Sequence, residues 1–75
     1  MEKMHWYNPT TRTMEDTNVP MNDEQAIDKL SHHEDSDEFI AHYRDWRVLG
    51  SSREEALLLT GEYYRAVHAG RTPPL

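Results

Sequence analysis

The clearest pattern of apolar and polar positions along the chain lies between residues 36 and 49. Its stripe, with steps of one, three, three and one residue, consists of Phe39, Ile40, Tyr43, Trp46 and Arg47. These steps place the side chains on one side of an α-helix. Asp35 and Glu38 have the spacing of a capping box, and Gly50 suits the left-handed residue that follows a helix. The pattern predicts an amphipathic helix over about residues 36–49.

A shorter helix is predicted before it, over about residues 23–32. Asn22 can cap this helix, and Gln25, three residues later, completes a capping box. One face at helical spacing is then formed by Ala26, Ile27 and Leu30. Such a face is typical of a helix that packs on one side only.

A third helix is predicted to begin after Gly50, because Ser51 and Ser52 are each followed three residues later by a glutamate. Its principal apolar stripe comprises Ala56, Leu59, Tyr63 and Val67. Gly61 leaves two alternatives open. Either the helix is continuous, at a cost of about 1 kcal/mol relative to alanine, or it breaks one residue earlier and a short helix follows.

The first twenty residues favour extended structure around a turn. Asn8-Pro9-Thr10-Thr11 has turn chemistry, since proline fixes φ and Asn or Thr side chains can bond nearby backbone. The segments on either side, 5–7 and 12–14, favour strands. An isolated two-stranded hairpin is only marginally stable in water. We therefore expect either a β-hairpin docked on the helices through Trp6 or a mobile N-terminal arm.

Together these elements predict a mainly α fold. It is a small three-helix assembly, in which a helical hairpin is covered by the first helix, with an N-terminal β-hairpin or mobile arm. The 75 residues suffice for a single small domain. We assign its parts as an arm or hairpin at 1–20, a helical core at 21–70 and a frayed tail at 71–75.

Composition and charge restrict the function classes. The chain has no cysteine, no apolar leader and no apolar run near the roughly 20 residues that cross a bilayer, which predicts a cytoplasmic protein without membrane contact. The formal net charge is −6, and the segment from Glu15 to Glu38 alone carries nine acidic residues and one lysine. Such a chain repels nucleic-acid phosphates. A basic protein partner fits better than direct nucleic-acid binding.

No constellation in the sequence indicates an enzyme, a cofactor or a metal. The histidine and carboxylate residues that come closest to a zinc site are His32, His33, Asp35, Asp37 and His42. They straddle a helix junction, whereas zinc sites need three or four ligands on a rigid frame, so a solvated loop is the better interpretation. The three glycines stand apart, which excludes a glycine-rich phosphate loop.

The candidate binding surface lies on a second line of the third helix. Leu57, Tyr64 and His68 lie beside the principal stripe there. They either flank the core or form an exposed apolar stripe of the kind that marks an interaction site. In the second case Arg53 and Arg65 would supply a polar rim. Trp6 and Tyr7 would add to this surface if the N-terminal arm is mobile.

The sequence therefore predicts a small acidic regulator or adaptor that docks on a larger cytoplasmic protein. Bacterial or phage accessory factors that act on nucleic-acid enzymes share its size and charge. One alternative is an acidic mimic of nucleic acid that blocks a DNA-binding enzyme. Another is a helix-turn-helix DNA-binding protein, with Gly50 in the turn. A homodimer also stays open, since an apolar stripe can meet its own copy.

Overall fold

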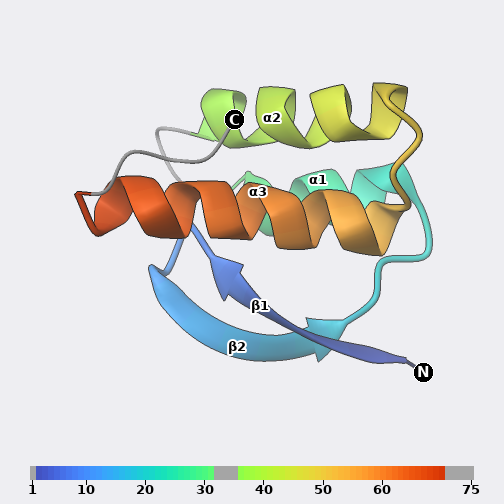
Figure 1. Ribbon diagram of the computed structural model, residues 1–75. Coiled ribbons are helices and arrows are strands. Elements are labelled where there is room, and N and C mark those ends of the chain that lie inside the picture. The colour runs from blue at the N-terminus through green and yellow to red at the C-terminus, as the bar shows by residue number, and fades with distance from the viewer. Residues whose placement is uncertain (1, 32–35, 71–75) are drawn as a thin grey trace.

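A computed structural model describes residues 2–31 and 36–70, and it contains a β-hairpin followed by three helices (Figure 1). The elements in chain order are β1 (Lys3–Asn8), β2 (Thr13–Asn18), α1 (Asp23–Leu30), α2 (Ser36–Val48) and α3 (Arg53–His68). The predicted small, mainly helical assembly is therefore observed, and of the two N-terminal alternatives the structure has the hairpin. The frayed tail predicted at 71–75 lies outside the described residues.

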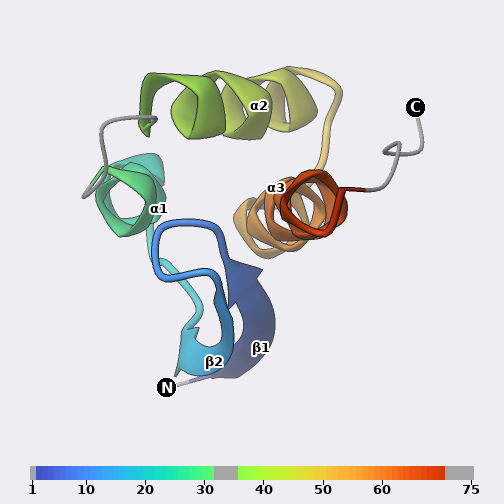
Figure 2. The same ribbon diagram turned by 90° about the vertical axis from the view of Figure 1, so that its left-hand side faces the viewer.

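The three helices lie above the hairpin in Figure 2, where α1 and α3 are seen nearly end-on and α2 runs across the view above them. The α2 and α3 helices run in opposite directions and are joined by the short turn at residues 49–52 (Figure 1). The α1 helix lies next to α2, and β1 lies along α3. The hairpin and the helices thus enclose one core between them.

Local side-chain bonds explain where the helices begin. The Asn22 side chain accepts a hydrogen bond from the Gln25 amide at 2.9 Å, and the Gln25 side chain accepts one from the Met21 amide at 2.8 Å. Ser52 caps α3 by accepting a bond from the Glu55 amide at 3.1 Å. Each cap satisfies an amide that the helix itself leaves free. The predicted Asp35 cap of α2 lies outside the described residues.

The hairpin turn is fixed by Asn8. Its side chain accepts a hydrogen bond from the Thr10 amide at 2.9 Å, and its carbonyl accepts one from the Arg12 amide at 2.8 Å. Arg12 adopts a φ of 61°, the left-handed conformation that closes the turn. The two strands then pair antiparallel from Lys3 opposite Asn18 to Asn8 opposite Thr13.

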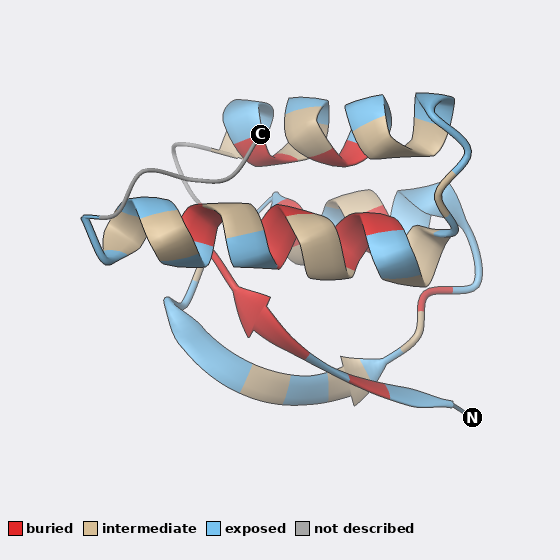
Figure 3. Cartoon of the chain, in the orientation of Figure 1, coloured by how far each residue is buried: buried red, intermediate tan, exposed pale blue. Residues whose placement is uncertain are grey.

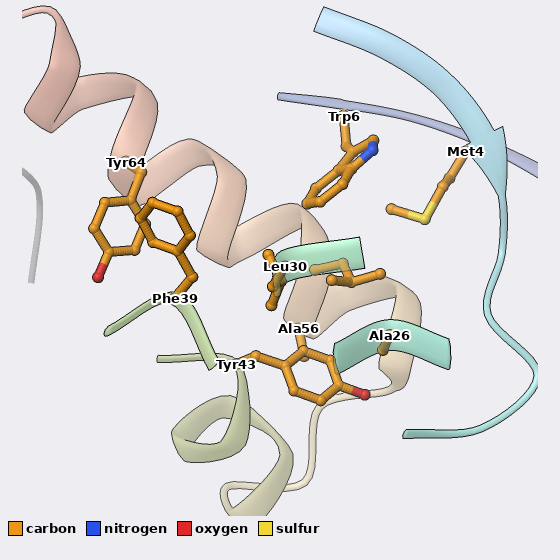
Figure 4. Packing of buried hydrophobic residues seen from close by; sticks show 9 residues of the cluster. Met4, Trp6, Ala26, Leu30, Phe39, Tyr43, Ala56 and Tyr64 are labelled. Atoms are coloured by element: carbon orange, nitrogen blue, oxygen red, sulfur yellow. The ribbon is translucent and has the colours of Figure 1, made fainter. Parts of the chain in front are cut away.

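The core receives side chains from β1 and from all three helices, and Figure 4 shows them pointing toward one another. Its large buried members are Met4, Trp6, Leu30, Phe39, Tyr43, Leu57 and Tyr64. The rings of Phe39 and Tyr64 meet edge to face with centroids 4.5 Å apart. Red bands in Figure 3 mark the inner faces of the elements, where this core lies.

The face that α3 buries differs from the predicted stripe. Its buried residues are Ala56, Leu57, Thr60, Gly61 and Tyr64. Of the predicted stripe only Ala56 is buried, while Leu59 and Tyr63 are half-buried and Val67 is exposed. The helix is continuous, so the break near Gly61 does not occur. A side-chain carbon at Gly61 would collide with the Tyr7 carbonyl oxygen and lie 3.4 Å from the Trp6 ring. The hairpin therefore docks at this glycine, and its contact sets the rotation of α3.

Candidate functional site

The residues of the candidate binding surface on the third helix are partly core residues. Leu57 and Tyr64 have exposed fractions of 0% and 8%, and Trp6 and Tyr7 have 1% and 8%. Of the two alternatives for Leu57 and Tyr64, the structure has core residues and not an exposed stripe, because the docked hairpin and α2 cover this side of α3. Trp6 and Tyr7 belong to the docked hairpin and are buried with it.

The remaining three predicted residues lie apart from one another along α3. His68, near its end, is half-buried, and its Nδ1 atom lies 2.7 Å from the Tyr7 hydroxyl. Arg65 is exposed and pairs with Glu62 at 3.5 Å. Arg53 is half-buried at the first turn, where its Nε donates to the Pro20 carbonyl at 3.4 Å. These contacts do not assemble a common surface from the predicted set.

A different apolar surface is exposed at one end of the helices. Val48, Leu49 and Met21 have exposed fractions of 85%, 75% and 69%. Val48 ends α2, Leu49 follows it, and Met21 precedes α1, so all three lie where α1 and α3 begin and α2 ends (Figure 1). We call Met21, Val48 and Leu49 the apolar end surface. The other large apolar side chains exposed in the described parts of the chain, Met14 and Val67, are open to about 40%.

The backbone at the end of α2 explains this exposure. The Leu49 amide still donates to the Asp45 carbonyl at 3.1 Å, so the helical path continues to the turn. Gly50 then reverses the chain with a φ of 102°, which a residue with a side chain rarely adopts. The Ser51 amide donates back to the Trp46 carbonyl at 3.1 Å. The turn is therefore closed by backbone bonds, and the core receives no side chain from Val48 or Leu49.

A charged network holds this end of the molecule together. The carboxylate of Asp23 accepts hydrogen bonds from the Tyr43 hydroxyl at 2.6 Å and from Arg47 Nε at 2.9 Å. These two bonds lower the pKa of Asp23, and burial raises the pKa of Tyr43. Arg47 also donates from Nη1 to the Ser51 carbonyl at 2.7 Å. One arginine thus links the start of α1, the last turn of α2 and the turn that carries the apolar end surface.

Two open hollows are both lined by Val19 and Pro20, in the segment that leads from the hairpin to α1. One has a volume of about 270 Å³ and is lined by Val19, Pro20, Arg47, Ser52, Arg53 and Glu54. The other, of about 520 Å³, has Met21 and the polar face of α1 on its walls, including Glu24. The apolar end surface therefore lies next to two hollows that a side chain of a partner can enter.

A second cluster lies between α2 and α3, around His42. Its ring stacks against Tyr63 with centroids 4.3 Å apart, and its Nδ1 lies 3.4 Å from Thr60 Oγ1. The Thr60 hydroxyl donates its own proton to the Ala56 carbonyl at 2.7 Å, so His42 is the donor in this contact. Burial lowers the pKa of His42. This arrangement favours a neutral histidine that packs against an aromatic ring.

The described residues offer no metal cluster and no membrane-spanning helix. No group of three or more histidine, cysteine, aspartate or glutamate side chains in residues 2–31 and 36–70 is arranged to hold a metal ion. The candidate ligands His32, His33 and Asp35 lie outside that range. Within the same part of the chain, no helix has the length and apolar character that crossing a bilayer requires.

The apolar end surface was missed because sequence reasoning followed stripes within helices. Val48 and Leu49 fall off the apolar stripe of α2 and stand just before a glycine turn. Apolar residues in that position do not reach the core, and this position in the sequence is the signal that could have identified them.

Comparison of the chain with models of known protein families, with curated proteins and with solved structures finds no match.

Proposed function

We propose that this protein is a small docking module, a regulator or adaptor that binds a larger cytoplasmic protein through its apolar end surface. The observation that carries the proposal is the exposure of Val48, Leu49 and Met21 together at one end. Single exposed apolar residues are ordinary on protein surfaces, but a group of them marks an interaction site. Burying each such side chain in a complex contributes about 1.5–3 kcal/mol.

Rigidity supports the same proposal. The bonds from Arg47 to Asp23 and to the Ser51 carbonyl fix the turn before any partner arrives. A surface that is already ordered loses little conformational entropy on binding, so more of its contact energy appears as affinity. The two hollows beside Val19-Pro20 add shape to this surface.

The described residues give less support to the two alternative functions, a nucleic-acid mimic and a helix-turn-helix DNA-binding protein. Acidic residues occupy the first turn of each helix, among them Asp23, Asp37 and Glu54. Negative charge stabilises a helix start whatever the function, so their placement needs no nucleic-acid mimicry to explain it. The start of α3, which a helix-turn-helix protein would insert into the major groove, carries Glu54 and Glu55 beside Arg53. Carboxylates in that position repel phosphates.

Site-specific photo-crosslinking tests the proposal. A photoreactive amino acid at position 49 should give one dominant crosslinked protein species in cells that produce the chain. The same residue at position 65, on the exposed side of α3, serves as a control and should give no such species. Adding Val48→Ser should reduce the yield at position 49 without loss of fold by circular dichroism. A yield that is equal at both positions contradicts the proposed surface.

A further inference from the structure

Carboxylates lie at the same end of the molecule as the apolar end surface. Two helices, α1 and α3, begin at this end, and each carries acidic residues in its first turn. Those that we call the acidic rim are Glu24, Glu54 and Glu55. Glu24 and Glu54 line the two hollows beside Val19-Pro20. The apolar side chains and the carboxylates are thus parts of one surface.

Nearby cations do not neutralise this rim. Arg47 pairs with Asp23 at 2.9 Å, so the charges of Arg47 and Asp23 offset each other. Arg47 also donates a hydrogen bond to the Ser51 carbonyl in the turn. Arg53 is the other cation that lines the same hollow as Glu54, and its Nε donates to the Pro20 carbonyl at 3.4 Å. No ion pair within residues 2–31 and 36–70 involves a member of the acidic rim. Two further cations at this end, Lys29 in the hollow of Glu24 and Arg44 one helical turn before Val48, are each matched by a neighbouring carboxylate, Asp28 and Asp45. The three rim carboxylates then remain against Arg53, and the surface has a negative excess.

The excess of negative charge distinguishes between the possible binding partners of this surface. A second copy would bring the same carboxylates against each other, and like charges facing one another oppose association. An anionic lipid surface would be repelled for the same reason. A partner with lysine or arginine around an apolar side chain satisfies both parts of the surface, because oppositely charged groups steer and orient docking.

We infer that the partner of the apolar end surface is a basic amphipathic segment, whose apolar side chains contact Val48 and Leu49 while its lysines or arginines face Glu24, Glu54 and Glu55. This inference rests on the proposed docking function and names the chemistry of the partner. Exposed ion pairs are individually weak, and three of ordinary strength together change a dissociation constant by about tenfold.

Selection from a displayed library of random 12-residue peptides tests the inference without a known partner. The intact protein serves as bait at low salt, and the Val48→Ser/Leu49→Ser variant is used for counter-selection. The variant keeps all the charges of the chain, so it removes peptides that bind its overall acidity alone. The peptides that remain should contain more lysine and arginine than aspartate and glutamate, next to apolar residues.

Affinity measurements on the selected peptides then separate the acidic rim from general charge. By fluorescence anisotropy, Glu24→Gln/Glu54→Gln/Glu55→Gln should weaken binding about tenfold. The matched control Asp37→Asn/Glu38→Gln/Glu62→Gln also removes three charges, but these lie at the start of α2 and midway along α3. It should change binding much less. Raising the salt concentration should weaken wild-type binding, a test that needs no variant.

The outcomes of the inference and of the proposed function are distinguishable. Selected peptides that depend on Val48 and Leu49 but are neutral or acidic overturn the inference and leave the docking function in place. An equal loss of affinity in the rim variant and its control also overturns the inference. If no peptide depends on the apolar end surface, the inference falls, and a failure of crosslinking at position 49 would remove the proposed function as well.

Discussion

Gly61 lies so close to the carbonyl oxygen of Tyr7 that α3 has no room there for a side-chain carbon. This contact joins the N-terminal hairpin to the last helix. It also turns Leu57 and Tyr64 toward the core, where their exposed fractions are 0% and 8%. A glycine in a helix loses about 1 kcal/mol relative to alanine in helix propensity. In this fold the close approach of the strand outweighs the lower helix propensity, because only glycine permits it.

The substitution Gly61→Ala should therefore destabilise the protein by about 1–3 kcal/mol, since overpacking against backbone outweighs the gain in helix propensity. Urea unfolding followed by circular dichroism measures the change. The exposed neighbour Glu62→Ala is the control and should stay within about 0.5 kcal/mol of wild type. A Gly61→Ala variant more stable than wild type would contradict the contact with Tyr7.

Two leucines on adjoining elements should respond in opposite ways to truncation. Leu57→Ala should cost about 2–5 kcal/mol, because it opens a cavity in the core. Leu49→Ser should stay within about 0.5 kcal/mol, because Leu49 is exposed to 75% and touches no core. Thermal unfolding of the two variants gives both values. Similar losses in the two would show that the rotation of α3 is wrong.

Helix boundaries were predictable because capping is local. The Asn22 and Ser52 caps each act within three residues, and the bounds predicted for the first two helices differ from the observed ones by two residues or fewer. The rotation of α3 was not predictable in this way. Leu57, Leu58 and Leu59 are consecutive, as are Tyr63 and Tyr64, so several faces of the helix are apolar. The choice between them depends on Gly61 meeting Tyr7, which is 54 residues earlier in the chain.

The candidate site was not predicted, because its residues lie outside the helical stripes. A search for binding residues along helical stripes selects the side chains with the most partners, and in this fold those residues form the core. Val48 and Leu49 belong to no stripe, and they are exposed because Gly50 reverses the chain directly after them. The sequence signal for such a surface is therefore a pair of apolar residues that lie off the helix stripe and directly precede a glycine turn.

Acid should weaken the Asp23 network. Because the pKa of Asp23 is held below its ordinary value of 3.8 in the fold, its contribution is fully present above that value and is lost as the pH falls through the lowered pKa. The Asp23→Asn variant should show a shallower loss of stability over this acidic range. Its unfolding midpoint in urea, measured as a function of pH, tests this. Tyr43→Phe removes one of the two bonds and should have an intermediate effect.

His42 should cause a separate dependence on pH at higher values. Burial between α2 and α3 lowers its pKa below the ordinary 6.5, the nearby Asp45 opposing this, so the unfolded chain takes up its proton first as the pH falls. The sign follows from linkage: stability is unaffected by this group above about pH 6.5 and decreases as the pH falls from there to the lowered pKa. The His42→Phe variant should lose this component while keeping the contact with Tyr63.

The chain has five histidines, so the difference between variant and wild type is the quantity to measure. Its control is His5→Phe, since His5 lies on the exposed face of the hairpin beside Asp16 at 2.6 Å. Burial favours the neutral form of His42. The component of the slope that His42 causes should therefore be absent from the His42→Phe variant and present in the His5→Phe variant. A His42 variant whose slope matches that of wild type would show that its ring is open to water in solution.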